Sequence, residues 1–123
     1  MMTERQKAVA YADKMFSLFI RERDPFCYCG KPTEQCGHLI SRASYSTRWL
    51  EDNAHGCCKG CNMSHEYRPE DYTNWWIKKH GSKAYDILVS LGHSIYKVSN
   101  CDLILIGDGF KRKCEELKNG QKG

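Results

Sequence analysis

The stretch CGHLISRASYSTRWLEDNAHGCCKGCN, residues 36–62, decides the fold, because it gathers four of the eight cysteines and two of the five histidines into one short segment. Three explanations compete for such a cluster: disulfide bonds, one structural metal ion, or an active site supported by a metal. The chain has 123 residues, which suits one domain. A domain this small buries a modest share of its surface, so a cross-link by metal or disulfide is expected to add needed stability.

The composition limits the compartment in which the protein works. No run approaches the roughly 18 apolar residues that cross a bilayer, so we expect no membrane association. The N-terminal sequence MMTERQKAVAYADKMF has early charges of both signs and no secretory cleavage site. We therefore expect a cytoplasmic protein in a reducing environment, where paired cysteines bind metal more often than they form disulfides. The formal net charge of +4 is a weak indication of an anionic partner.

The apolar periodicity of the chain predicts a mostly helical α+β fold in one domain. Residues 4–21 place apolar side chains at helical spacing, and Thr3 and Gln6 can form a capping box in front of them. The predicted parts are an N-terminal helix (1–23), a zinc-bound core (24–68), a helical extension (69–118) and a tail (119–123).

The helical extension is predicted to contain three helices. They begin near Pro69, Ser82 and Ser99. The last has a second capping box with Asp102, and the segment HSIYKV (93–98) before it has an extended pattern. Cys101 and Cys114 fall on the apolar stripe of this last helix, so we predict that both are buried thiols outside any metal site.

The cysteine-rich core has a different pattern, which predicts a β-hairpin followed by a short helix. QCGHLI (35–40) and TRWL (47–50) are the best short strands, and the polar loop SRASYS joins them. The short helix is predicted to start near Lys59. It would carry Cys61, Asn62, His65 and Glu66.

The cysteine spacing predicts a structural Zn²⁺ site. Cys58-Lys-Gly-Cys61 has the spacing of a zinc knuckle, in which two thiolates reach one tetrahedral ion. The upstream pair is Cys27 and Cys29 in FCYCGK, a C-x-C spacing that is one residue shorter than usual. Cys36 or Cys57 is the alternative for one of the four ligands. Such a site contributes folding free energy directly.

The order of three polar residues around the knuckle resembles the HNH or ββα-metal nuclease pattern. These residues are His38, Asn53 and Asn62. With the flanking sequences FIRERD, CGHLISR, STRW, DNAHGCCKGCN and EYRPEDY, the chain from about residue 19 to 80 is similar to the phage NinG/Rap recombination proteins. The resemblance implies a zinc-stapled ββα-metal core and a divalent-metal-dependent DNA endonuclease.

The resemblance also assigns roles to residues. His38 matches the general base, Asn53 the residue that braces the loop, and Asn62 a ligand of the catalytic ion. Many HNH enzymes have a metal-binding Asp before the first His, where this chain has Gly37. The second protein ligand therefore stays open. The candidates are His65, Glu66 and His55.

The chemistry of phosphodiester hydrolysis explains these residue types. A neutral imidazole can take a proton from water at physiological pH. A hard cation, Mg²⁺ or Mn²⁺, neutralises charge on the phosphate and prefers oxygen ligands such as the Asn62 carboxamide. The expected products are a 5′-phosphate and a 3′-hydroxyl.

Basic side chains beside the predicted hairpin are expected to bind DNA. Arg42 and Arg48 flank it and Lys59 starts the short helix, so all three are predicted to contact phosphates. Such contacts do not read sequence, so we expect cleavage directed by branched or strand-exchange DNA structure in the host bacterial cytosol. Phage or host recombination proteins are possible partners, and a homodimer could form through the helices 69–80 and 99–118.

Two alternatives remain at this point. The same zinc fold could be a non-catalytic module that binds recombination DNA, an interpretation that Gly37 keeps open. It could also be an HNH nuclease for DNA packaging or host-DNA degradation, with the same site residues and a different substrate.

Overall fold

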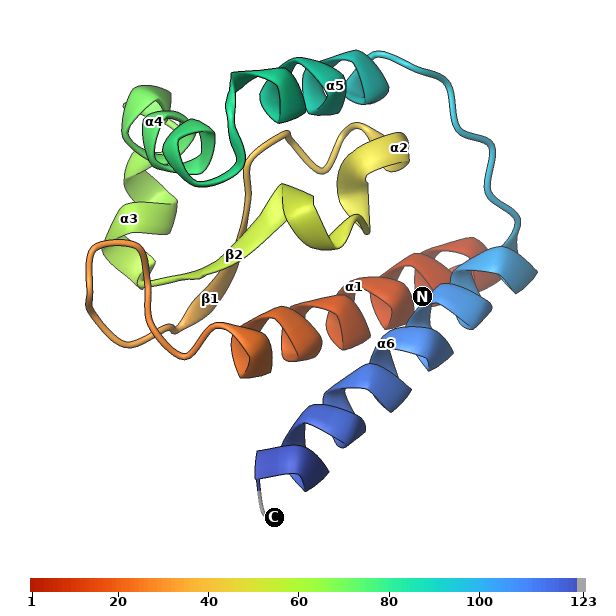
Figure 1. The fold of residues 1–123 in the computed structure, drawn as a ribbon. Coiled ribbons are helices and arrows are strands. Elements are labelled where there is room, and N and C mark those ends of the chain that lie inside the picture. Colours follow the sequence, from red (N-terminus) through yellow and green to blue (C-terminus); the bar gives the residue numbers. More distant parts are fainter. Residues whose placement is uncertain (122–123) are drawn as a thin grey trace.

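The computed structural model describes residues 1–121, and two long helices form its lower layer in Figure 1. α1 (Glu4–Arg23) and α6 (Asn100–Gln121) lie side by side and run in the same direction. Their N-terminal ends meet where Nη1 of Arg5 donates to the Val98 carbonyl oxygen at 2.6 Å. The last element of the chain therefore completes a core that the first element begins.

The apolar stripes predicted for both helices form this core. Its members on the two helices are Ala8, Ala12, Phe16, Phe19, Ile20, Leu103, Phe110 and Cys114. A Cβ at Gly107 would lie within 2.4 Å of the Tyr11 ring, so this glycine permits the close approach of the helices. Both predicted capping boxes form, at Thr3 and at Ser99. The buried position predicted for Cys101 is wrong, because its side chain is exposed.

The C-terminal boundary also differs from the prediction. The tail predicted over 119–123 is helical as far as Gln121, because α6 continues beyond its last buried residue. Residues 122–123 lie outside the described part of the chain.

A two-stranded antiparallel ribbon lies above this layer. β1 (Gln35–His38) pairs with β2 (Ala54–Cys57), and His38 lies opposite Ala54. The first predicted strand is thus present, but TRWL as the second strand is wrong. Its first two residues end α2 (Tyr45–Arg48), Trp49 caps that helix, and a 3-10 turn, η1 (Glu51–Asn53), leads into β2. Thr and Trp favour strands, yet here their side chains reach the interior from a helical turn.

Three helices cover the other side of the ribbon (Figure 1). They are α3 (Lys59–Ser64), α4 (Pro69–His80) and α5 (Ser82–Gly92). The last two match the prediction, with Gly81 at φ +96° between them. α3 is shorter than predicted, and 93–98 contains no strand. A second buried cluster joins these helices to the ribbon. Its members are Cys27, Leu39, Cys57, Cys58, Tyr72, Trp76 and Leu88.

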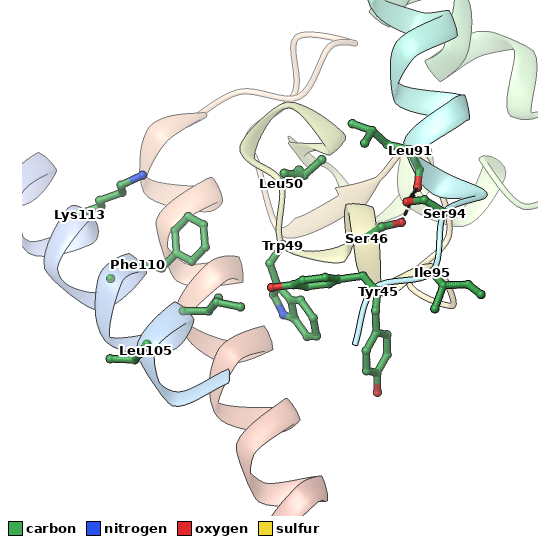
Figure 2. Close-up of a pocket in the computed structure, with 13 residues that line it drawn as sticks. Tyr45, Ser46, Trp49, Leu50, Leu91, Ser94, Ile95, Leu105, Phe110 and Lys113 are labelled. Atoms are coloured by element: carbon green, nitrogen blue, oxygen red, sulfur yellow. Dashed lines mark hydrogen bonds between the residues drawn. The ribbon is translucent and has the colours of Figure 1, made fainter. Parts of the chain in front are cut away.

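An apolar groove opens between α6 and the segment that precedes it. In Figure 2, Phe110 and Leu105 of α6 lie on one side and Ile95 on the other, with Trp49 between them. The groove shares no residue with the hollow around His38 described below. Among residues 1–121, no helix has the length and apolar character needed to cross a membrane.

Candidate metal centre and active site

Four cysteine sulfurs converge at one end of the ribbon. The Sγ atoms of Cys27, Cys29, Cys58 and Cys61 all lie within 4.8 Å of one another, and those of Cys29 and Cys58 are 3.7 Å apart. A tetrahedral zinc site with Zn–S bonds of about 2.3 Å has sulfur–sulfur edges of about 3.8 Å. The four thiols therefore fit a metal such as zinc, with the C-x-C pair included. The alternative ligands Cys36 and Cys57 are not part of the group.

Local backbone structure positions both cysteine pairs. In the upstream loop, Cys27 N–H donates to the Lys31 carbonyl at 2.8 Å and Gly30, at φ +94°, closes the turn. The Lys31 backbone N–H lowers the pKa of the Cys29 thiol to about 7, which favours the thiolate that metals bind. The tight turn around Cys29 explains why a single intervening residue is sufficient.

The downstream pair uses a helix N-terminus. Cys58 is the N-cap of α3, and its sulfur accepts the backbone N–H of Cys61 at 3.4 Å. Tyr28, between the upstream cysteines, stacks on Tyr72 and Trp75 of α4. The centre thus connects the loop before β1 with α3 and α4.

His38 ends β1 with one ring nitrogen fixed by the backbone. Its Nε2 lies 2.9 Å from the carbonyl oxygen of Arg48. A carbonyl only accepts, so the neutral ring carries its proton on Nε2 and leaves a lone pair on Nδ1. Nδ1 makes no hydrogen bond with any residue in the range 1–121. Burial lowers the pKa of His38, which favours the neutral ring at physiological pH.

Asn53 is completely buried and holds the connection between the two strands. Its Oδ1 accepts from Ile40 N–H at 2.8 Å, and its Nδ2 donates to the carbonyls of Ile40 at 3.1 Å and Thr47 at 3.0 Å. These contacts tie the residues after β1 to α2. The side chain therefore braces the loop that follows His38.

Replacing Asn53 by Ala is expected to lower the free energy of unfolding by about 2 to 4 kcal/mol, because backbone groups of Ile40 and Thr47 lose their buried partners. Urea unfolding of the zinc-loaded chain measures the change. Asn74→Ala, at an exposed position of α4, is the matched control and should stay within about 0.5 kcal/mol of the parent. Equal effects of the two substitutions would contradict the bracing role.

Asn62 projects from α3 toward β1. Its Nδ2 donates to Oε1 of Gln35 at 2.8 Å. A Cβ at Gly37 would lie 3.0 Å from the Asn62 Oδ1 and 2.6 Å from the Cys57 Sγ. A side chain at this position would therefore have to displace Cys57 or Asn62, so packing favours glycine before His38. The Asn62 oxygen occupies the space beside this backbone.

His38 and Asn62 line one hollow of about 940 Å³ between α1, β1 and α3. Successive strand residues face opposite sides, so Gly37 faces α3 while His38 faces Phe16 of α1 at a ring distance of 5.5 Å. His38 and Asn62 therefore reach this hollow from opposite faces of β1. Other residues on its wall include Asp13, Arg21, Glu34, Arg42, Lys59 and Tyr67.

The three candidates for a second ligand of a hard ion differ in position. His65 follows α3 in the hollow, with Nε2 3.2 Å from the Leu39 carbonyl and Nδ1 buried without a partner in residues 1–121. Glu66 is exposed and also lines the hollow. His55 is a wrong candidate, because it lies in a separate depression against Trp75, with Nε2 3.6 Å from Oδ2 of Asp24.

The ligand atoms of these residues do not form a second closed cluster. In the described residues, only the four cysteines bring three or more His, Cys, Asp or Glu ligand atoms within 4.8 Å of one another. A hard cation in the hollow would therefore take Asn62 and one or two neighbours from the protein. Water would complete its coordination, as Mg²⁺ commonly allows.

The basic residues separate into two kinds. Arg42 and Lys59 are exposed at the hollow. Arg48 is not available to a phosphate in the same way, because it forms a two-point ion pair with Asp13 at 3.0 and 2.6 Å. The predicted DNA contact of Arg48 is therefore replaced by a structural role. Local sequence could not reveal this partner, which lies 35 residues away.

Sequence reasoning also missed the wall that α1 contributes to the hollow. Asp13, Ser17 and Arg21 lie there. The only signal in the sequence is a row of polar residues beside the apolar stripe of α1, which is typical of any amphipathic helix. Tyr67, with 75% of its surface exposed, is a further aromatic residue at the rim.

A family model described as "Bacteriophage Lambda NinG protein" matches residues 2–121. The match covers the helices at both ends as well as the cysteine-rich core. Comparisons with curated proteins and with solved structures gave no match.

Proposed function

The chain belongs to the bacteriophage lambda NinG family, and from this membership we propose that it is a phage recombination endonuclease of the HNH type. Its substrate would be branched or strand-exchange DNA, and its reaction the metal-dependent hydrolysis of a phosphodiester. The observation that carries the proposal is the state of His38. Its Nε2 is held by the Arg48 carbonyl, which leaves the Nδ1 lone pair without a hydrogen bond to residues 1–121, and His38 and Asn62 line the same hollow.

Each of these residues has a separate role in the proposed hydrolysis. Nδ1 of His38 takes the proton of the attacking water, and the Arg48 carbonyl stabilises the resulting imidazolium through Nε2. Asn53 keeps this carbonyl in place through the loop that it braces. Asn62, with His65 or Glu66, would hold Mg²⁺ or Mn²⁺, which supplies charge neutralisation at the phosphate when bound. The cysteine centre would hold zinc and act through the fold alone.

DNA would lie along the hollow with its phosphates near Arg42 and Lys59. Replacing either residue by Ala should reduce the slope of log K against log salt by about one unit, because one phosphate contact is lost. Fluorescence anisotropy with a labelled four-way junction over a salt series measures this. Lys118→Ala, on an exposed turn of α6, is the control. If both variants kept the slope of the parent chain, Arg42 and Lys59 would not be phosphate contacts.

The proposal is tested by incubating the zinc-loaded chain and Mg²⁺ with linear, flapped, D-loop and four-way substrates. We expect cleavage of the branched substrates to be faster than that of plain duplex. Preference for plain duplex would instead favour a nuclease for packaging or host-DNA degradation. Binding with no cleavage of any substrate would overturn the catalytic proposal.

A non-catalytic DNA-binding module is the second candidate. The specific observation in its favour is the packing of Gly37, which leaves no room for the metal-binding Asp of many HNH enzymes. Under this alternative, the variant His38→Ala binds and behaves like the parent chain in every assay.

A further inference from the structure

Asp13 of α1 lies at the middle of a hydrogen-bond network with Arg48 and Trp49. Its carboxylate accepts from Nε of Arg48 at 3.0 Å, from Nη2 of Arg48 at 2.6 Å and from Nε1 of Trp49 at 3.0 Å. The side chains of Asp13 and Arg48 are only 23% and 15% exposed. A two-point ion pair of this kind is geometrically specific and holds both partners in one orientation.

The residues that Asp13 holds are the residues that orient the imidazole. Arg48 gives the carbonyl that accepts the Nε2 proton of His38, and its side chain packs over Tyr45 and Trp49. Nη1 of Arg48 also donates to the Arg42 carbonyl at 3.0 Å, which fixes the preceding loop. Position and direction of the accepting carbonyl therefore depend on a carboxylate in a different element.

We propose that Asp13 is a positioning residue for His38, which acts through Arg48 and Trp49 to keep the imidazole in the Nε2–H form with its lone pair on Nδ1. The inference rests on the proposed role of His38 as general base. It extends that role, because it makes α1 part of the active site. Asp13 itself does not contact the imidazole through any hydrogen bond in the described residues.

A merely structural ion pair would act differently from a positioning residue. It would change stability without changing the tautomer of one particular histidine. The variant Asp13→Asn keeps the size of the side chain and removes the charge that holds Arg48. Asp108→Asn is the matched control, since Asp108 also accepts a hydrogen bond that joins two elements, from Tyr11 of α1 to α6, and neither residue lines the hollow of His38.

The experiment uses the full zinc-loaded chain, labelled with ¹⁵N at histidine, at a pH where the ring is neutral. The two-bond ring spectrum distinguishes the Nε2–H from the Nδ1–H tautomer. We expect His38 to be in the Nε2–H form in the parent chain and in the control Asp108→Asn. In Asp13→Asn we expect a mixture of the two tautomers. An unchanged His38 spectrum in Asp13→Asn would overturn the proposal.

Kinetics give a second readout on a cleaved four-way junction. In Asp13→Asn we expect kcat to fall about 10- to 100-fold, as for other residues that orient a catalytic imidazole, with KM changed less than about twofold. If Asp13→Asn folds poorly, Arg48→Lys tests the same link, because Lys keeps the charge without the two-point contact. A chain that cleaves no substrate would overturn the proposed function, whereas the tautomer comparison would still decide the role of Asp13.

Discussion

Removing zinc from the folded chain is expected to unfold the ribbon and the helices packed on it. The cysteine centre connects the loop before β1 with the start of α3, and two of its members, Cys27 and Cys58, belong to the second buried cluster. The ribbon has only two strands of four residues, which cannot be stable alone. Structural zinc binding supplies about 10 kcal/mol or more in small metal-dependent domains, which is comparable with the entire stability of a domain.

The measurement combines chelation with two matched cysteine variants. Cys58→Ser removes one of the four converging thiols, and Cys101→Ser removes an exposed thiol outside the group. We expect a chromogenic chelator to detect one zinc per chain in the parent and in Cys101→Ser. In Cys58→Ser, and in the chelated parent, the amide signals of β1 and α3 should collapse to random-coil positions. Dispersed signals after complete chelation would show that the thiols are not a structural metal site.

The four converging cysteines could be predicted because their geometry is local. Cys58 and Cys61 are placed by one helix start, and Cys27 and Cys29 by one turn. Only the pairing of the two knuckles is a long-range property, and it follows from the chemistry of a tetrahedral ion. The same reasoning could not decide against Cys36 or Cys57 from sequence, since both lie in the ribbon close to the ligands in the chain.

The second strand could not be predicted because packing overrides propensity there. TRWL has residues that favour strands, but the hydrogen bonds of the buried Asn53 side chain replace a β-ladder in this loop. The true partner strand, Ala54–Cys57, includes a glycine and has no alternating pattern. Gly56 is nevertheless required, because a Cβ there would lie 2.5 Å from the Asp24 carbonyl oxygen.

The candidate site around His38 also combines residues that the local sequence predicts with long-range partners that it does not predict. Of the three residues that the sequence order singled out, His38 and Asn62 line one hollow, whereas Asn53 does not line it and braces the loop after β1. The partners that hold them come from distant segments: Asp13 reaches Arg48, and Gln35 engages Asn62. His55 has a residue type and spacing suited to the site, yet it lies in a different depression. The register between β1 and β2 decides where His55 lies, and amino-acid composition does not encode that register.

Replacing His38 by Ala is expected to abolish DNA cleavage while DNA binding remains close to that of the parent. Loss of a general base lowers rates by about 10²- to 10⁴-fold. The phosphate contacts proposed for Arg42 and Lys59 do not involve the imidazole, so affinity should be preserved. Single-turnover cleavage of the preferred branched substrate and anisotropy with the same substrate measure the two quantities.

Two further variants separate loss of the base from loss of structure. His38→Gln retains an N–H that can donate to the Arg48 carbonyl but has no group that takes a proton from water, so it should fold like the parent and remain inactive. His93→Ala removes an exposed histidine at the end of α5 and should cleave normally. Activity of His38→Gln near that of the parent would exclude His38 as the general base.

The cleavage rate constant is expected to change with pH in the direction that a general base requires. Burial lowers the pKa of His38 below the ordinary value of 6.5, so the neutral, proton-accepting ring predominates at neutral pH and persists into mildly acidic solution. The cleavage rate constant of the parent should therefore be level around neutrality and fall as the pH drops through this lowered pKa. The residual rate of His38→Gln should lack that inflection. If the same inflection remained in His38→Gln, the titrating group would be another residue, and the role of His38 would be reduced to packing against Phe16.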